Sequence, residues 1–404
     1  MSVIRPFNGV RFKGANISKF ICPPYDVISS DEKKRLKNLS NNNMVKLELP
    51  DSLGTKNKYQ QAAFLFDSWQ KNNVMNKDDK PAFYFYEQKF SDNGKGMKRC
   101  GFLAALKLEN PHGGSVKPHE KTLAKPKQDR LSMLRAVKAN LSPIFGLFND
   151  DKKIVVNICK KISGKSPDSV AKDKDGVSHK LWKVEDEKII DKISKVLKSQ
   201  KVFIADGHHR YETAWNYSQS RKKKNRKHKG NEPYNYVMIF LCPMQDKGLS
   251  IWPTHRVFDE PKDMEAKIDK YFNVSNGSKY KKLKSNALQP LLFYKKGKFR
   301  TLTLKNKTTL NEFMKGECSS SKNLGVSMLH KILLKGVSPE YIRYVKSEKE
   351  AIKKANSEKC VAMIVPATPM KALKEIATLN QTMPQKSTYF YPKVTTGMVL
   401  HSVK

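Results

Sequence analysis

The chain has 404 residues and a formal net charge of +40, because its 78 lysines and arginines outnumber 38 acidic residues. At roughly 100–200 residues per domain, this length predicts two or three domains with a large buried core. Hydrophobic residues make up 38% of the chain, which argues against global disorder. So basic a surface attracts polyanions such as nucleic acid, anionic membranes or phosphorylated ligands, without choosing among them.

Membrane, secreted and zinc-finger classes are not expected. The longest apolar run lies near Tyr236–Pro243, far short of the roughly 20 residues that a spanning helix needs. The first twelve residues, MSVIRPFNGVRF, contain no apolar stretch of signal-peptide length. The cysteines are far apart and form no CxxC pair, so we expect free core thiols, no membrane partner and a cytoplasmic location.

Segments of strand and helix periodicity follow one another along the chain. In chain order, we predict a helix capped at Ser29 and Ser30, a helix at Lys58–Lys71, strands at Ala82–Tyr86 and Gly101–Leu108, a helix at Arg130–Ala139, a strand at Ile144–Phe148, a helix at Glu185–Leu197, a strand at Val202–Ala205, a helix at Tyr211–Ser218, a strand at Tyr236–Cys242, a helix at Pro261–Tyr271, a strand at Leu291–Tyr294, a helix at Ser347–Asn356 and a strand at Val361–Pro366. This mixture predicts an α/β or mixed α+β class.

Three polar segments are predicted to be loops: Gly164–Gly176, Ser220–Glu232 and Ser275–Ser285. The second, SRKKKNRKHKGNE, is a basic run that would suit a nucleic-acid arm or a localisation signal. A solvated surface insertion is the favoured interpretation, because lysines are spread over most of the chain and charge runs are usually solvated.

The stretch VFIADGHHRYETA, from Val202 to Ala214, concentrates the most chemistry. An apolar strand ends at Asp206–Gly207, and His208, His209 and Arg210 then begin a helix-like segment. A strand, a tight glycine turn and a helix start point backbone N–H groups at an anion. Arg210 adds a fork that matches phosphate, and Asp206 is a candidate ligand for Mg²⁺. We therefore predict a phosphate-binding turn.

A second cluster, KPHEKTLAKPKQDRLSMLR, starts at Lys117. Glu120 beside Lys121 is a candidate base–cation pair, in which the carboxylate takes a hydroxyl proton and the ammonium holds a phosphoryl oxygen. We further assign His119 to substrate binding and Thr122 and Arg130 to phosphate binding. The alternative interpretation is a charged loop followed by an ordinary helix start.

Three smaller clusters add candidates. Pro23–Pro24 forms a rigid turn that presents Tyr25 and Asp26 as substrate-binding candidates. Arg256 follows His255, and Lys393 lies in the late segment MPQKSTYFYPK; both are phosphate-binding candidates. The chain contains no GxxxxGK[ST], no GxGxxG and no HRD/DFG set, so the standard motifs that cradle ATP are missing.

The motifs HEKTLAKPKQDR, NLSPIF, ADGHHRYETA, PTHRVF and MPQKSTYFYPK, with the opening IRPF…CPPYDV, resemble a full-length family described as a domain of unknown function. The resemblance runs from Ile4 to about Val399. The DGHHR motif also resembles the signature of the ParB/sulfiredoxin superfamily. His208 stands where sulfiredoxins have their catalytic cysteine, and no helix-turn-helix segment like that of the partition proteins is visible.

Within that superfamily the chain is most similar to the free serine kinases, and among them to those that use pyrophosphate. The resemblance implies a ParB/sulfiredoxin-like core at 116–260, with further α/β regions at 1–115 and 261–404. It implies that Glu120 is the base for the serine hydroxyl, and that His208, His209 and Arg210 grip the phosphate, with His209 and Arg210 also catalytic.

The predicted reaction is transfer of a phosphoryl group, with Mg²⁺, from pyrophosphate, ADP or ATP to L-serine. Pyrophosphate has no base or ribose, so it needs cations and Mg²⁺ rather than an adenine slot. Two alternatives stay open: a ParB-like protein that binds nucleic acid, which the +40 charge motivates, and a phosphatase that uses water at the same site.

Overall fold

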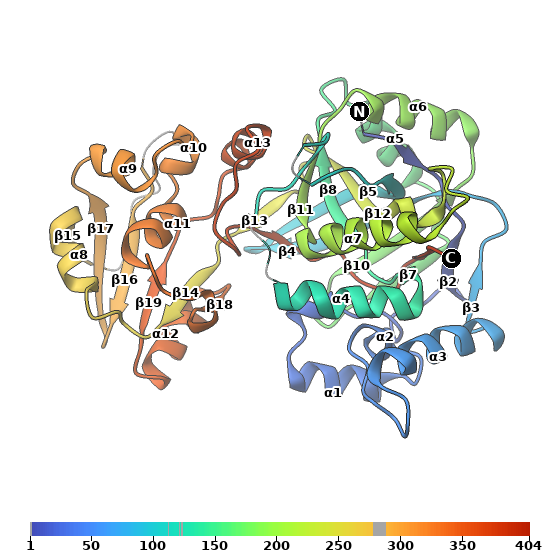
Figure 1. Ribbon diagram of the computed structural model, residues 1–404, viewed down its shortest axis with the longest axis horizontal. Coiled ribbons are helices and arrows are strands. Elements are labelled where there is room, and N and C mark those ends of the chain that lie inside the picture. The colour runs from blue at the N-terminus through green and yellow to red at the C-terminus, as the bar shows by residue number, and fades with distance from the viewer. Residues whose placement is uncertain (1, 112, 121, 123, 278–287) are drawn as a thin grey trace. The chain divides into compact units, whose positions relative to one another are not determined.

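The computed structural model describes the chain except residues 1, 112, 121, 123 and 278–287, and residues 124–126 are described by their backbone only. The described chain divides into two compact units, which are treated separately below (Figure 1). Unit 1 comprises Met1–Pro118, Thr122–Ser250 and Pro392–Lys404, and unit 2 comprises His119–Lys121 and Ile251–Tyr391.

Unit 1 is built on a large mixed sheet. Over the described residues the strand order is β6-β11-β8-β12-β5-β4-β10-β9, with β1 paired to β5, and a smaller sheet has the order β3-β2-β21-β7. The strands are β1 (Ile4–Arg5), β2 (Gly9–Phe12), β3 (Met75–Lys77), β4 (Phe83–Asp92), β5 (Lys95–Lys107), β6 (Val116–Lys117), β7 (Ala139–Asn140), β8 (Ile144–Phe148), β9 (Ser169–Lys172), β10 (Ser178–Val184), β11 (Val202–Asp206), β12 (Tyr236–Pro243) and β21 (Leu400–Ser402).

The helices of unit 1 pack on its two sheets and on one another. They are η1 (Tyr25–Val27), α1 (Ser30–Leu39), α2 (Val45–Glu48), α3 (Lys58–Lys71), α4 (Ala124–Val137), α5 (Ile154–Ile162), α6 (Glu187–Lys198), α7 (His208–Lys224) and η2 (Pro233–Asn235). Every residue of β12 is buried, as expected for a central strand covered on both faces. One apolar cluster joins β4, β5, β8 and β12 to α5, α6 and α7, and α4 lies beside α7 (Figure 1).

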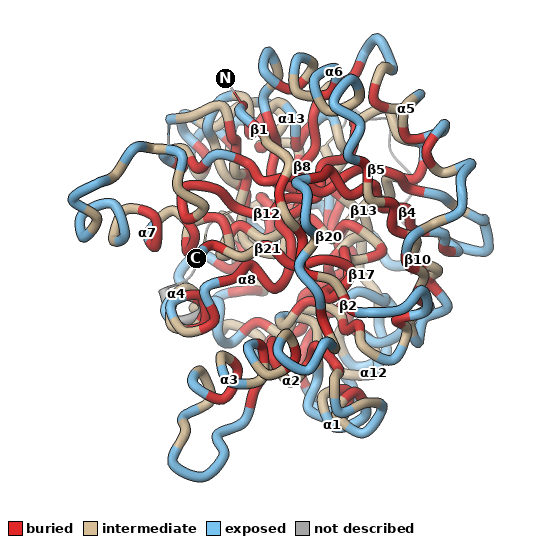
Figure 2. Tube along the Cα trace, turned by 90° about the vertical axis from the view of Figure 1, so that its right-hand side faces the viewer, coloured by how far each residue is buried: buried red, intermediate tan, exposed pale blue. Residues whose placement is uncertain are grey.

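Unit 2 contains a sheet of order β15-β17-β16-β19-β14-β18, and β13 pairs with β20. Its elements are β13 (Ser250–Trp252), β14 (His255–Phe258), α8 (Met264–Tyr271), β15 (Phe272–Asn276), β16 (Leu291–Lys295), β17 (Lys298–Leu304), α9 (Thr308–Phe313), α10 (Ser319–Lys322), α11 (Gly325–Met328), η3 (Leu329–Leu333), η4 (Pro339–Tyr341), β18 (Arg343–Val345), α12 (Glu348–Ser357), β19 (Val361–Ile364), α13 (Met370–Thr378) and β20 (Tyr389–Tyr391). Its main apolar core joins β14, β16, β17 and β19 to α8 and η3. Figure 2 shows the described residues coloured by burial, with the exposed ones mostly in peripheral loops and helices.

The mixed α/β class is confirmed, and each predicted strand and helix is present: α3 and β8 have the predicted bounds, and the others have shifted ends. Other elements were not predicted, among them α5, β9, β10 and α13. Helix α5 follows Lys153, whose φ is 53°, and the N–H groups of Ile154 and Val156 at its start donate to the Asp150 carboxylate. Strand β9 lies inside the predicted loop Gly164–Gly176. Helix α7 continues to Lys224 and so includes the start of the predicted loop Ser220–Glu232. Of the loop Ser275–Ser285, residues 278–285 lie outside the described residues.

The two units group the chain differently from the three predicted regions. The predicted boundary at 115–116 lies inside unit 1, and unit 2 takes in Ile251–Tyr391 where the third predicted region was 261–404. The physical reason is strand pairing: β5, which precedes residue 115, pairs with β12, which follows it. The ParB/sulfiredoxin-like core stays a prediction. Among the described residues, no helix is both long and apolar enough to cross a membrane.

Candidate functional site

The predicted sequence of strand, tight glycine turn and helix start is present, and its binding of phosphate stays a prediction. Strand β11 ends at Asp206, Gly207 adopts a left-handed conformation with φ 90°, and α7 begins at His208. The first N–H groups of a helix have no intrahelical acceptor and carry the positive end of the helix dipole. The turn therefore presents donors and positive potential to an anion.

Charged side chains surround Asp206. One of its carboxylate oxygens accepts a hydrogen bond from Arg210 Nη2 at 2.6 Å, and the other contacts Lys393 Nζ. Arg210 Nη1 also donates to the carbonyl oxygen of Pro143. The side chains of Arg210, Asp206 and Lys393 are only 12%, 17% and 11% exposed. Partial burial strengthens these charge interactions, so the two cations are held in place before any ligand binds.

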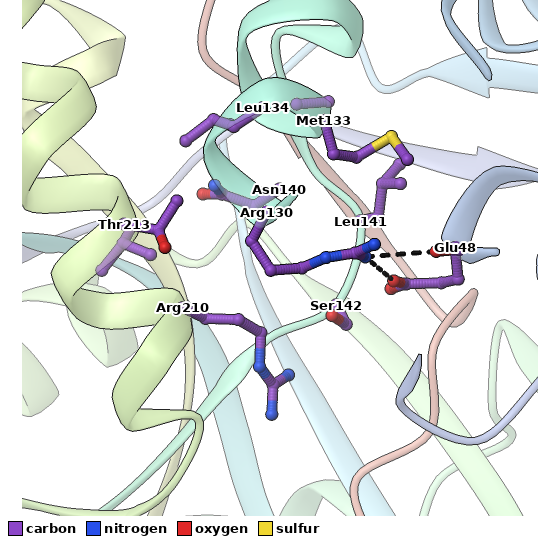
Figure 3. A pocket seen from close by; sticks show the side chains of 11 residues that line it. Glu48, Arg130, Met133, Leu134, Asn140, Leu141, Ser142, Arg210 and Thr213 are labelled. Atoms are coloured by element: carbon purple, nitrogen blue, oxygen red, sulfur yellow. Dashed lines mark hydrogen bonds and ion pairs between the residues drawn. The ribbon is translucent and has the colours of Figure 1, made fainter. Parts of the chain in front are cut away.

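A cavity of about 50 Å³ lies beside the turn, and both Arg210 and Arg130 line it (Figure 3). Arg130 projects from α4 toward Glu48, and Arg210 projects from α7 (Figure 3). Asn140 and Ser142, on either side of Leu141, also line it. The NLSPIF motif thus contributes both cavity wall and, through Pro143, the carbonyl that anchors Arg210.

Arg130 is extensively paired. Its Nη1 donates to the Glu48 carboxylate at 3.2 Å, and its Nη2 donates to Asp129 Oδ2 at 2.5 Å. Its guanidinium lies over the Tyr25 ring, 4.2 Å from the centroid. Burial, reinforced by the charge of Asp26, raises the pKa of Tyr25 to about 12 although Arg210 and Arg130 oppose the shift. Tyr25 therefore stays a neutral phenol close to both arginines.

The pKa of Asp129 is lowered to about 2: burial acts against this shift, and hydrogen bonds from Lys58 and Arg130 outweigh it. The predicted phosphate ligand Arg130 therefore serves first as a structural partner of two carboxylates.

His208 is buried at the turn and His209 is half-buried. Thr122 donates its hydroxyl to Glu212 Oε2 at 2.8 Å, and Lys127 Nζ lies 2.8 Å from the same oxygen.

The remaining described candidates lie in unit 2. His119 is fully buried and its Nε2 lies 3.0 Å from Thr388 Oγ1. Glu120 pairs with Met383 in a β-bridge. Its Oε1 accepts hydrogen bonds from the backbone N–H and the hydroxyl of Thr388, both at 3.3 Å. The predicted base is therefore held in a defined orientation by the MPQKST segment. Lys121 lies outside the described residues.

Arg256 is fully buried in unit 2 and donates to the carbonyl oxygens of Gln385 and Lys386 at 3.1 and 3.0 Å. Burial lowers its pKa to about 10, against the opposing charges of Tyr344 and Glu120. Because its donors hold backbone carbonyls, we infer that Arg256 orders the segment that orients Glu120. Its predicted contact with phosphate stays a prediction.

The structure therefore brings Tyr25, Arg130, Asp206, Arg210 and Lys393 together in unit 1 and places His119, Glu120 and Arg256 in unit 2. For Mg²⁺ the fit is poor, because both oxygens of Asp206 already contact cations. Among the described residues no group of three or more His, Cys, Asp or Glu could hold a metal ion. The predicted role of Asp206 as a ligand stays a prediction.

Sequence reasoning missed three residues of these clusters. Glu212 lies four residues after His208 in the DGHHRYE stretch, so helical spacing could have placed it beside the turn. Glu48 has no neighbouring motif that would have marked it. Arg99 is fully buried on β5 and lies close enough to Asp206 for their charges to interact, and only strand pairing brings it there.

Gly207→Ala should disable the turn. A Cβ would lie 3.0 Å from Arg210 Nε and Nη2, and φ is 90°. Left-handed backbone costs a non-glycine residue about 1–2 kcal/mol, and the contact would displace Arg210 as well.

Gly230 provides a matched control, because its φ is also 90° but no atom lies within 4 Å of its Cβ position. Urea unfolding should show similar losses of stability in both variants, whereas ³¹P-detected binding of pyrophosphate should weaken only in Gly207→Ala. Equal binding in the two would contradict the role of the turn.

Comparison with known proteins places this chain in a family. The family model described as "Protein of unknown function (DUF1015)" matches residues 4–329, and the search of curated proteins found no match. A free serine kinase in complex with AMP is 11% identical with a TM-score of 0.35, covering 68% of this chain and 83% of that one.

Two other solved structures give similar values. A conserved hypothetical protein from Pyrococcus furiosus is 12% identical with a TM-score of 0.36, covering 69% of this chain and 89% of that one. SbnI from Staphylococcus aureus, truncated at its C-terminus, is 11% identical with a TM-score of 0.38, covering 72% and 84%. Such values carry no inference about activity.

Proposed function

We propose that this chain, which belongs to the family described as "Protein of unknown function (DUF1015)", is a phosphotransferase that phosphorylates free L-serine. In the proposed reaction the serine hydroxyl oxygen attacks one phosphorus atom of pyrophosphate. The bond from that phosphorus to the bridging oxygen breaks, and orthophosphate leaves. The hydroxyl proton passes to Glu120, and the product is O-phospho-L-serine.

One observation carries the proposal: the turn between β11 and α7 gathers Arg210, Lys393 and a helix N-terminus around a single carboxylate. Transfer of a phosphoryl group depends mainly on positioning and on stabilising charge that spreads over the transferred oxygens. Arg210 supplies a planar fork held at two points, by Asp206 and by Pro143. A fork held in this way costs little reorganisation when a phosphate arrives.

Pyrophosphate is the donor that this chemistry favours. The sequence has no glycine-rich loop of the kinds that cradle nucleotide phosphates. A donor without a base or ribose must derive its binding energy from charge-assisted hydrogen bonds and from the metal ion it carries. In this proposal Mg²⁺ arrives with pyrophosphate as part of the substrate complex.

The assignments of serine and of Glu120 rest on the DGHHR and HEKT motifs and their resemblance to free serine kinases. The contacts of Glu120 are compatible with a base: Thr388 engages Oε1, and no hydrogen bond involving Oε2 was found among the described residues. A carboxylate with one oxygen anchored and the other available can accept a proton in a fixed direction.

Phosphorus NMR of the protein with L-serine, Mg²⁺ and one donor at a time tests the proposal. We expect a new O-phosphoserine resonance together with orthophosphate when pyrophosphate is the donor, with slower turnover for equal concentrations of ADP and ATP. Chelation of Mg²⁺ should abolish the reaction, because the donor then loses its bridging cation. Orthophosphate without O-phosphoserine would identify a phosphatase instead, and a clear preference for ATP would refute the donor assignment.

A further inference from the structure

A second cavity of about 460 Å³ lies in unit 1 and shares no lining residue with the cavity at the turn. Its lining includes Arg5, Lys77 and Lys404 together with the aromatic rings of Phe7 and Phe66. No acidic residue occurs among the described residues that line it. Its volume is within the range of small-molecule sites, about 300–1,000 Å³.

His401 gives this cavity a buried polar group without a partner. The residue lies on β21, is 5% exposed and lines the cavity. Its ring packs edge-on against Phe7 with centroids 4.7 Å apart. Its Nε2 has no hydrogen-bond partner among the described residues. A buried polar atom left unpaired is costly, so a ligand that pairs with Nε2 would regain that energy.

The positive charges around His401 favour an anionic ligand. Burial, reinforced by the charges of Arg5 and Lys77, lowers the pKa of His401 to about 3. The imidazole is therefore neutral at pH 7, and as the Nε2–H tautomer it can donate a hydrogen bond. An anion between these groups would relieve the repulsion between the two cations and accept that hydrogen bond.

Two contacts hold the Arg5 guanidinium in place and engage only part of its N–H groups. Its guanidinium lies 3.6 Å from the Tyr236 ring centroid, and its Nη1 donates to the carbonyl of Asn231 at 2.8 Å. The fork has five N–H groups, so donors are left for a ligand. Lys404 lies 3.1 Å from Asp67, and both side chains are about half exposed, so this lysine belongs to the rim.

We propose that this cavity binds a phosphate monoester of a small, partly apolar molecule. The dianionic phosphate lies against Arg5, Lys77 and His401, and the apolar body packs on Phe7 and Phe66. Two neighbouring cations favour a dianion over a monocarboxylate because Coulomb attraction scales with charge. This site is independent of the proposed function and of the residues that carry it.

Titration calorimetry with phenyl phosphate tests the proposal, with phenol and inorganic phosphate as the two half-ligands. We expect saturable binding of phenyl phosphate and weaker binding of either half-ligand. Lys77→Gln, an exposed position, should bind about tenfold more weakly. The matched control Lys80→Gln, also exposed but outside the cavity lining, should bind normally.

His401 supplies a second readout. On binding, its ring resonances in a proton–nitrogen spectrum should shift and its pKa should rise, because an adjacent dianion favours the charged imidazole. The proposal is overturned if phenyl phosphate does not bind saturably, if Lys77→Gln binds as the wild type does, or if Arg210→Lys rather than Lys77→Gln removes binding. The last result would place the phenyl phosphate at the turn.

Discussion

Arg210→Lys should lose at least about a hundredfold in the rate of phosphoryl transfer, the range typical of removing one donor that stabilises developing charge. Lysine keeps the positive charge but cannot hold Asp206 and the Pro143 carbonyl with two fixed N–H groups, as Arg210 does. The ammonium would follow one partner and leave the other unsatisfied. Steady-state rates with pyrophosphate and L-serine, measured beside urea unfolding, separate this loss from a loss of folding.

Arg221→Lys is the matched control for that substitution. Arg221 lies on the same helix, α7, and is exposed, so the same change of side chain there should leave the rate unaltered. If Arg210→Lys turns over at the wild-type rate, the fork is not used in the reaction and the phosphate-binding assignment of the turn fails.

Glu120→Gln should lower turnover by about 10²–10⁴-fold, the range that a general base contributes. The amide retains an oxygen that can accept both hydrogen bonds from Thr388, so the local fold should persist. What disappears is the capacity to take the serine proton. Pyrophosphate binding, measured by calorimetry, should stay within about twofold of the wild type, since a base that acts on the acceptor contributes to kcat rather than to donor affinity.

Glu348→Gln controls for a change of charge in unit 2. Glu348 is an exposed residue at the start of α12, and its substitution should leave kcat unchanged. A Glu120→Gln protein with turnover within about a factor of two of the wild type would remove Glu120 from the role of base and would leave the turn in unit 1 unaffected.

The turn was predictable from the sequence because all of its parts are local. Asp206, Gly207 and Arg210 lie within five residues, and the bond between Asp206 and Arg210 has the i,i+4 spacing of a helix. A strand, a positive-φ glycine and a helix start follow from β periodicity, glycine's conformational freedom and helix periodicity. The predicted strands and helices were found for the same reason: each reflects a periodic pattern within one segment.

The partners of these residues were decided by tertiary structure alone. Lys393 contacts Asp206 from 187 residues away, and Arg130 is held by Glu48 from 82 residues away. Neither pairing has a local signature, because strand order and helix packing determine which side chains meet. The short edge strand β9 pairs with β10, the next strand along the chain, and was missed because it lies within a polar segment rich in Lys, Asp and Ser.

The sequence by itself determined the mixed α/β class, the strand–glycine–helix turn and the residue types available for the chemistry. Tertiary structure decided how those residues are distributed and used. It divides the HEKT stretch between the two units, with Glu120 in unit 2 and Thr122 in unit 1. It also pairs Arg130 with the buried carboxylate of Glu48 and brings Arg5, Lys77 and His401 together around a cavity that no motif marks. The physical reason is that periodicity and turn chemistry act over a few residues, whereas ion pairs and cavities arise where distant segments pack together.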